Sequence, residues 1–177
     1  MQCIPKIILD YASKGSLRSY IEEKIELQIK NGKPEYIDHR MIKRILAQVT
    51  FGMCEANNCP AGKVMHKDIK PANILLDHNE QVKICDFGIS KVYDKTESVK
   101  EKMAGTRLYI AQEKLKNEGN ITSDVFSLGV VGYELLTLTK PFSDECDIKN
   151  GEAPAEISKD RRKHYDAKLI ECVLVCL

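Results

Sequence analysis

Four polar residues in the middle of the chain have the types and the spacing that transfer of a phosphoryl group requires. Asp68 lies on a predicted loop between two apolar segments, where its carboxylate could accept the proton of an attacking hydroxyl. Lys70 follows two positions later and could place a positive charge beside the phosphoryl group. Asn73 and Asp86 offer one neutral and one charged oxygen, which are hard ligands that suit Mg²⁺. The set indicates a site that acts by positioning and charge stabilisation.

A predicted β-hairpin explains how two of these residues could meet. Residues 74–76 and 82–85 are short apolar runs, and the polar residues 77–80 join them, which is typical of two antiparallel strands. A hairpin returns the chain to its starting point. The oxygens of Asn73 at its beginning and of Asp86 at its end can therefore approach the same cation.

Two amphipathic helices are predicted upstream of this site. Ser16 can cap the first helix, and the sequence NGKP at residues 31–34 ends it. Asp38 can cap the second, whose apolar residues recur at three- and four-residue spacing. The predicted buried stripes are Leu17, Tyr20, Ile21 and Ile25 in the first helix, and Ile42, Ile45, Leu46, Val49 and Met53 in the second.

The downstream half alternates between polar and apolar segments. Residues 89–106 are polar and without periodicity, so we expect an exposed loop. Residues 124–138 are apolar nearly all round, which predicts a buried helix. Residues 147–163 are polar and charged and are interpreted as loop or solvated surface. Residues 169–177 predict a core helix.

Composition excludes several classes of protein. The chain has 177 residues, 43% of them hydrophobic, and a net charge of +1, which argues against a dedicated nucleic-acid binder. Its seven cysteines include no CxxC pair, so we expect reduced thiols in a cytoplasmic protein. We predict no signal peptide, because the apolar run at residues 7–9 is too short for one. We predict no membrane partner, because the apolar stretch at residues 169–177 is far shorter than the ~20 residues that span a bilayer.

Two motifs together carry a specific resemblance. Residues 66–73 read HKDIKPAN, and residues 86–88, after the predicted hairpin, read DFG. Either motif alone is weak evidence, but the combination resembles a eukaryotic-type serine/threonine protein kinase. Further matches are Gly105-Thr106-x-x-Tyr109, Ala111-Gln112-Glu113, and a central helix that begins near Asp124.

The resemblance implies a fold and a division of the chain. The expected fold is α+β and mainly helical: the C-terminal lobe of a kinase with a short β-hairpin at the catalytic site, lacking most of the N-lobe sheet. Residues 1–177 would form a partial kinase domain. Its parts would be a hinge strand at about 6–12, a catalytic loop at 66–73, an activation segment at 86–113 and a central buried helix at about 124–138.

The resemblance also assigns roles to single residues. Asp68 and Lys70 would be catalytic, and Asn73 and Asp86 would hold Mg²⁺ and, through it, ATP. Thr106 would help to dock a protein substrate that carries the acceptor serine or threonine. His66 and Phe87 would stack in a buried column anchored at Asp124, and Glu113 would pair with a late arginine. The remaining ATP contacts would come from Leu9, Asp10, Tyr11, Ala12 and Leu75.

The sequence also departs from the family pattern. It has no glycine-rich loop, no upstream strand lysine and no partner glutamate, so we expect a fragment of a kinase that is inactive in isolation. The alternative is a pseudokinase-like binding module. Gln112 replaces a proline and should loosen the turn before Glu113. Lys67 replaces an arginine that pairs with an activating phosphate, for which Thr96 and Ser98 are the candidate sites.

Overall fold

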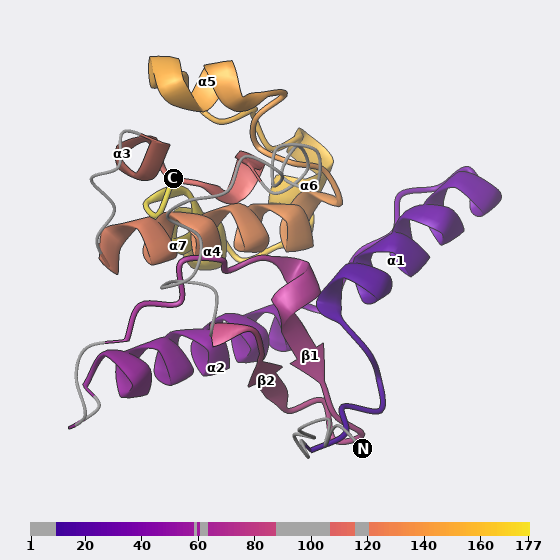
Figure 1. The fold of residues 1–177 in the computed structure, drawn as a ribbon. Coiled ribbons are helices and arrows are strands. Elements are labelled where there is room, and N and C mark those ends of the chain that lie inside the picture. The colour runs from indigo at the N-terminus through magenta and orange to yellow at the C-terminus, as the bar shows by residue number, and fades with distance from the viewer. Residues whose placement is uncertain (1–9, 59, 61–63, 88–106, 116–120) are drawn as a thin grey trace, which may run out of the picture.

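The computed structural model describes residues 10–58, 60, 64–87, 107–115 and 121–177, and helices dominate it (Figure 1). A single sheet of two strands accompanies them within these residues. The helices are α1 (Leu17–Asn31), α2 (His39–Asn57), α3 (Gln112–Leu115), α4 (Ile121–Thr137), α5 (Glu145–Asn150), α6 (Lys159–His164) and α7 (Ala167–Leu174). The strands are β1 (Ile74–Leu76) and β2 (Val82–Ile84), and single 3₁₀ turns cover Pro71–Asn73 and Arg107–Tyr109.

The hairpin predicted from the sequence is confirmed. β1 and β2 are antiparallel, with Ile74 opposite Ile84 and Leu75 opposite Lys83. The side chain of Asp77 closes the turn by accepting the backbone N–H groups of Asn79 and Gln81, at 2.8 and 2.9 Å. The second strand ends at Ile84, one residue before the predicted end. The hairpin therefore returns the chain as its turn chemistry predicts.

The caps predicted for the first two helices are also present. Ser16 accepts the N–H of Ser19 at the start of α1, and Gly32 ends that helix in the left-handed conformation, at φ 61°. Asp38 accepts the N–H groups of Arg40 and Met41 at the start of α2. Because these caps satisfy backbone groups that a helix end leaves unpaired, the sequence alone fixes where both helices begin.

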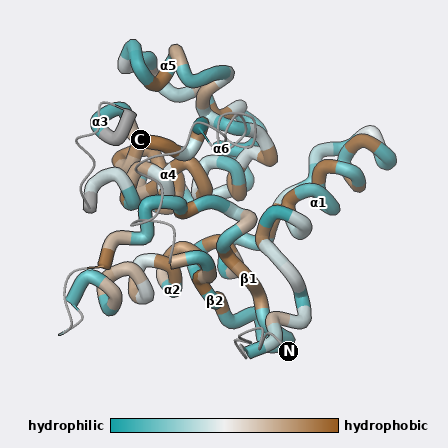
Figure 2. Tube along the Cα trace, in the orientation of Figure 1, coloured by the Kyte–Doolittle hydropathy of each residue, from teal (hydrophilic) through white to brown (hydrophobic). Residues whose placement is uncertain are grey.

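Helix α4 lies in the middle of the core. It begins at Ile121, three positions before the predicted start, and its residues Val130, Val131, Leu135 and Leu136 are fully buried. Helices α2 and α7 pack against it. Figure 2 shows hydrophobic residues along α4, as the all-round apolar pattern predicts.

The prediction of loop or solvated surface for residues 147–163 is wrong in part, because two short helices occupy this region. Asp144 and Asp147 form a capping box at the start of α5, and Gly151 ends it at φ 69°. Ser158 caps α6. Half of the residues of α5 and five of the six residues of α6 are exposed. Their sequence therefore lacks the apolar periodicity that predicts a helix, and local capping defines them instead.

The predicted hinge strand is not seen where it can be assessed. Residues 10–12 are irregular, and residues 6–9 lie outside the described part of the chain. The chain pairs with β1 slightly later instead. The N–H of Lys14 donates to the carbonyl of Leu76 at 3.0 Å, and the N–H of Leu76 donates to the carbonyl of Gly15 at 2.9 Å.

Close packing of α4 on α7 depends on Gly132. A Cβ atom at this position would lie 2.8 Å from Cγ2 of Val173, closer than side chains approach one another. We predict that Gly132→Val lowers the free energy of unfolding by about 2 kcal/mol, because the added methyl groups force α7 away. Chemical denaturation of the purified protein measures the change.

A second substitution tests this cause. Val173→Ala removes both methyl groups that the new side chain would meet. We expect Gly132→Val combined with Val173→Ala to be more stable than Gly132→Val alone. If the double variant is the less stable of the two, steric overlap with Val173 is not the reason for the loss.

Candidate active site

The loop that carries Asp68 is fastened to the start of α4. The buried carboxylate of Asp124, only 3% exposed, accepts the N–H of His66 at 2.9 Å and the N–H of Lys67 at 2.8 Å. Lys67 has a φ of 65°, a backbone conformation that side chains other than glycine adopt at some energetic cost. The two hydrogen bonds that these N–H groups donate to Asp124 hold the backbone in that conformation next to Asp68.

Asp68, Lys70 and Asn73 form one cluster. The Lys70 Nζ atom lies 2.7 Å from Oδ2 of Asp68, and both side chains are about one-fifth exposed. The Nδ2 atom of Asn73 donates to the carbonyl of Asp68 at 2.8 Å and to its Oδ2 atom at 2.9 Å. Because the amide nitrogen is directed at Asp68, the amide oxygen of Asn73 is the group left to accept a hydrogen bond or bind a cation.

The hairpin brings Asp86 beside this cluster. The N–H of Cys85 donates to the carbonyl of Asn73 at 3.0 Å, so the chain returns to Asn73 immediately before Asp86. Asp86 is exposed and has a φ of 65°. The sequence predicted that the oxygens of Asn73 and Asp86 could reach one point, and this return of the backbone supports that prediction.

His66 fastens the loop that carries Asp68 to the end of the hairpin. Its Nδ1 atom accepts the N–H of Asp68 at 3.2 Å, so its Nε2 atom carries the proton and donates to the carbonyl of Cys85 at 2.8 Å. Its ring meets that of Phe87 edge to face, with 4.7 Å between centroids. The predicted contact of His66 with Phe87 and the anchor at Asp124 are both confirmed.

The proposed ATP contacts are described only in part. Asp10 forms an ion pair with Lys83 at 2.8 Å, and Lys83 lies opposite Leu75 in the hairpin. Lys83 holds the pKa of the Asp10 carboxyl below its usual value. Asp10 and Leu75 therefore lie near the same position of the sheet. Tyr11 is exposed and Ala12 is half-buried, while Leu9 lies outside the described residues.

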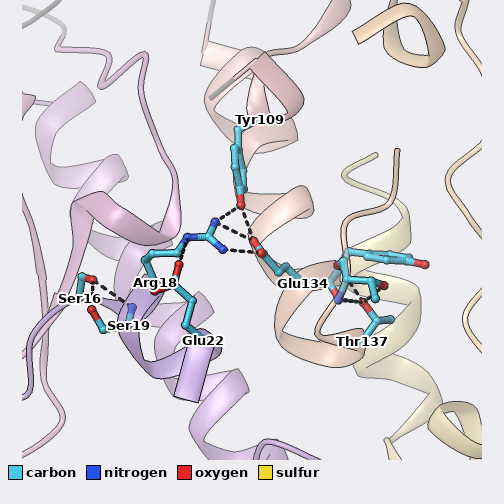
Figure 3. A network of polar contacts seen from close by, with 9 residues as sticks. Ser16, Arg18, Ser19, Glu22, Tyr109, Glu134 and Thr137 are labelled. Atoms are coloured by element: carbon cyan, nitrogen blue, oxygen red, sulfur yellow. Dashed lines mark hydrogen bonds and ion pairs between the residues drawn. The ribbon is translucent and has the colours of Figure 1, made fainter. Parts of the chain in front are cut away.

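Helix α4 holds the 3₁₀ turn Arg107–Tyr109 through both the backbone and the side chain of Tyr109. The backbone carbonyl of Tyr109 accepts the hydroxyl of Ser127 at 2.6 Å. The side-chain hydroxyl of Tyr109 donates to the carboxylate of Glu134 (Figure 3). Arg18 of α1 joins the same carboxylate, with Nη1 2.8 Å from Oε1. Burial and the neighbouring Glu134 carboxylate raise the pKa of Tyr109, so its hydroxyl stays protonated and acts as a donor.

Sequence reasoning missed Arg18 and Glu134. A signal for Glu134 was present, because it is a charged residue within the apolar segment 124–138 and is only 3% exposed. A buried carboxylate needs a partner that is itself charged or donates hydrogen bonds. Nothing in the sequence around Arg18 indicates that it is this partner.

The segment after the turn is tied to α5. Glu145 binds Arg107 at 2.5 Å and Lys149 at 2.6 Å, and these two contacts lower the pKa of its carboxyl. The side chain of Gln112 donates to the carbonyl of Lys149 at 2.6 Å. A proline could not make this contact, so the predicted loosening of the turn is countered by a new hydrogen bond.

The described partners of Glu113 lie at the start of α4, and its pairing with a late arginine stays a prediction. Its carboxylate accepts the hydroxyls of Ser123 and Thr122 at 3.0 and 3.1 Å, at the start of α4. Thr96, Ser98 and Thr106 lie outside the described residues, so their proposed roles stay predictions.

The described residues contain no group of three or more His, Cys, Asp or Glu side chains that could hold a metal ion by themselves. Asn73 and Asp86 fit Mg²⁺ in another way, since this ion commonly takes one or two protein oxygens and completes its shell with phosphates and water. None of the helices in the described ranges is long and apolar enough to cross a membrane.

Comparison with known proteins gives consistent matches. The model of the protein kinase domain matches residues 4–171. The chain is 31% identical over 140 residues to the human serine/threonine-protein kinase Nek2, which covers 77% of this chain and 30% of that protein. It is 34% identical over 137 residues to the probable serine/threonine-protein kinase nek2 of Dictyostelium discoideum, covering 77% of the chain and 31% of that protein.

A third relative is named a dual specificity kinase. The dual specificity protein kinase shkC of Dictyostelium discoideum is 35% identical over 147 residues, which cover 81% of this chain and 27% of that protein. The chain thus spans less than a third of the length of these relatives.

Proposed function

The chain belongs to the protein kinase family, and on that premise we propose that it carries the catalytic loop of a serine/threonine kinase that uses ATP and Mg²⁺. The observation that carries the proposal is the cluster of Asp68, Lys70 and Asn73, with Asp86 returned beside it by the hairpin. These are the groups that positioning and charge stabilisation of a phosphoryl group require.

The proposal assigns a role to each of these residues. Asp68 orients the acceptor hydroxyl and accepts its proton, while Lys70, 2.7 Å away, stabilises negative charge on the phosphoryl group. Asn73 holds Asp68 in place through Nδ2 and, with Asp86, would hold Mg²⁺. The bound ion would neutralise charge on the phosphates of ATP. Asp124 keeps the loop in its conformation and contacts no reactant.

We further propose that the described residues form the C-terminal lobe of the kinase, with ATP on the side of β1 and Leu75. The acceptor is proposed to be serine or threonine, because Lys70 follows Asp68 by two positions and two of the relatives are named serine/threonine kinases. The third relative is named a dual specificity kinase, so phosphoamino-acid analysis of the products is the deciding measurement.

The test of the function is transfer of the γ-phosphoryl group of ATP by the full-length protein. We expect phosphorylation of serine- or threonine-containing peptides that requires Mg²⁺ and stops when the ion is chelated. A protein that binds MgATP or partner proteins but transfers nothing to any peptide would instead be the binding module that the sequence left as an alternative.

The two proposed Mg²⁺ ligands should contribute unequally to the binding of MgATP. We predict that Asp86→Ala weakens binding of MgATP more than Asn73→Ala does, because Asp86 brings a full negative charge to the cation and Asn73 only a dipole. Calorimetry on the full-length protein measures both. Asn79→Ala, in the exposed turn of the hairpin, is the matched control and should change nothing. The reverse ranking of Asp86 and Asn73 contradicts the assignment.

A further inference from the structure

Residues 14–16, which lead into α1, are hydrogen-bonded to β1, the strand that carries Leu75. Lys14 and Gly15 exchange backbone hydrogen bonds with Leu76, at 3.0 and 2.9 Å, and Ser16 forms a β-bridge with Leu75. Ser16 is also the cap of α1. The first turn of α1 thus has a fixed place relative to β1.

Arg18 lies in that first turn and reaches α4 and the 3₁₀ turn Arg107–Tyr109. Its guanidinium binds both oxygens of Glu134, at 2.8 and 3.4 Å, and donates to the hydroxyl of Tyr109 (Figure 3). Glu134 and Tyr109 are each 3% exposed, whereas the Arg18 side chain is 26% exposed. One arginine therefore closes a contact between α1, α4 and the 3₁₀ turn Arg107–Tyr109.

The contact of Arg18 and Tyr109 with Glu134 restricts how the three residues can be placed. A buried carboxylate is stable only when its oxygens are paired, and here Arg18 and Tyr109 supply the pairing. The planar guanidinium meets the carboxylate with two nitrogens, which fixes orientation as well as distance. Movement of the turn away from α1 would leave the charge of Glu134 with fewer donors.

The catalytic loop does not depend on these contacts. Asp68 is placed by Lys70 and Asn73, and its loop by Asp124, one turn of α4 before Ser127. Loss of Arg18 should therefore disturb the 107–109 turn and leave the Asp68 cluster intact.

We propose that Arg18 is a positioning residue that fixes the 107–109 turn relative to β1, and so sets where an acceptor peptide docks relative to the nucleotide. The inference rests on the proposed function, which places ATP on the side of β1 and Leu75, and on the family resemblance, which assigns substrate docking to Thr106, the residue before this turn. Arg18 itself touches neither reactant. Its contribution is expected in the KM for the peptide and not in the chemical step.

The test uses Arg18→Met in the full-length protein, because methionine keeps an apolar stem and removes the guanidinium. We expect the KM for an acceptor peptide to rise roughly tenfold, while kcat and the KM for ATP stay within about threefold. Arg18→Lys should restore part of the loss, since it keeps the charge but lacks the fork. The matched control is Arg162→Met on α6, an exposed arginine that donates to the carbonyl of Ile157.

A second variant removes a single atom of the network. Tyr109→Phe deletes the hydroxyl and should raise the KM for the peptide in the same direction. In that background, Arg18→Met should add less than it does alone, because both changes break one network. An unchanged KM for the peptide in the folded Arg18→Met or Tyr109→Phe variant overturns the proposal, as does an equal rise in Arg162→Met.

Failure of the proposed function can be distinguished from failure of the positioning role of Arg18. If the unmodified protein phosphorylates no peptide, the proposed function fails, and hydrogen exchange then decides the role of Arg18. The amide of Ile110 donates to the carbonyl of Arg107 and reports on the turn. Exchange that is faster in Arg18→Met than in Arg162→Met supports the positioning role, and equal exchange contradicts it.

Discussion

Asp68→Asn should lower the rate of phosphoryl transfer by roughly 100-fold or more, the usual contribution of a general base. Asparagine has the shape of aspartate and can still accept the hydrogen bond from Asn73, but it cannot accept the proton of the acceptor hydroxyl. It also loses the charge that holds Lys70 at 2.7 Å. The measurement is kcat with a peptide acceptor, using the full-length protein.

The matched control for this change is Asp160→Asn on the exposed surface of α6, which removes the same charge far from the site. Its kcat should equal that of the unmodified protein. Binding of MgATP to Asp68→Asn should be retained, because Asn73 and Asp86 are unchanged. Activity of Asp68→Asn within a few-fold of the unmodified protein would remove Asp68 from its proposed role.

Asp124→Ala should have the largest effect on stability. The carboxylate accepts two backbone N–H groups, and removal of it leaves the buried His66 N–H without its acceptor. Each donor left without a partner costs about 1–3 kcal/mol, so we expect a loss of about 2–6 kcal/mol in the free energy of unfolding. This is a large part of the stability of an ordinary domain. Chemical denaturation measures it.

Asp124→Asn distinguishes the effect on stability from the effect on kcat. Its side chain keeps one oxygen that can accept a backbone N–H group. This variant should fold, lose less stability than Asp124→Ala, and still show reduced kcat, because Asp68 follows directly on the loop that Asp124 anchors. Asp144→Ala removes a carboxylate that caps the exposed helix α5 and should cost about 1 kcal/mol. A loss in Asp124→Ala no larger than that of Asp144→Ala would contradict the anchoring role.

The sequence predicts what is determined locally. The hairpin depends on Asp77 and its near neighbours, and the caps Ser16 and Asp38 bind backbone groups within three residues. The cluster of Asp68, Lys70 and Asn73 is compact because its members are separated by five positions at most. Short-range chemistry of this kind can be read from residue types and spacing.

The contacts that join distant segments are not predictable in this way. Arg18 and Glu134 are separated by 116 positions, and no periodicity in either helix indicates that they meet. Helices α5 and α6 were missed for a different reason. Their sequences are polar on most sides, so only the caps Asp144 and Ser158 distinguish them from loop.

The anchoring of the Asp68 loop by Asp124 of α4 has a consequence for synthesis of the protein. Asp124 follows the two backbone groups that it binds by 58 and 57 positions. At a translation rate of about 5–20 residues per second, the ribosome adds this interval in roughly 3 to 12 seconds. During that time the nascent chain contains Asp68 and its neighbours but not the carboxylate that fixes their backbone. The loop at residues 66–68 therefore reaches its final conformation only after Asp124 has been added, however early its own residues are made.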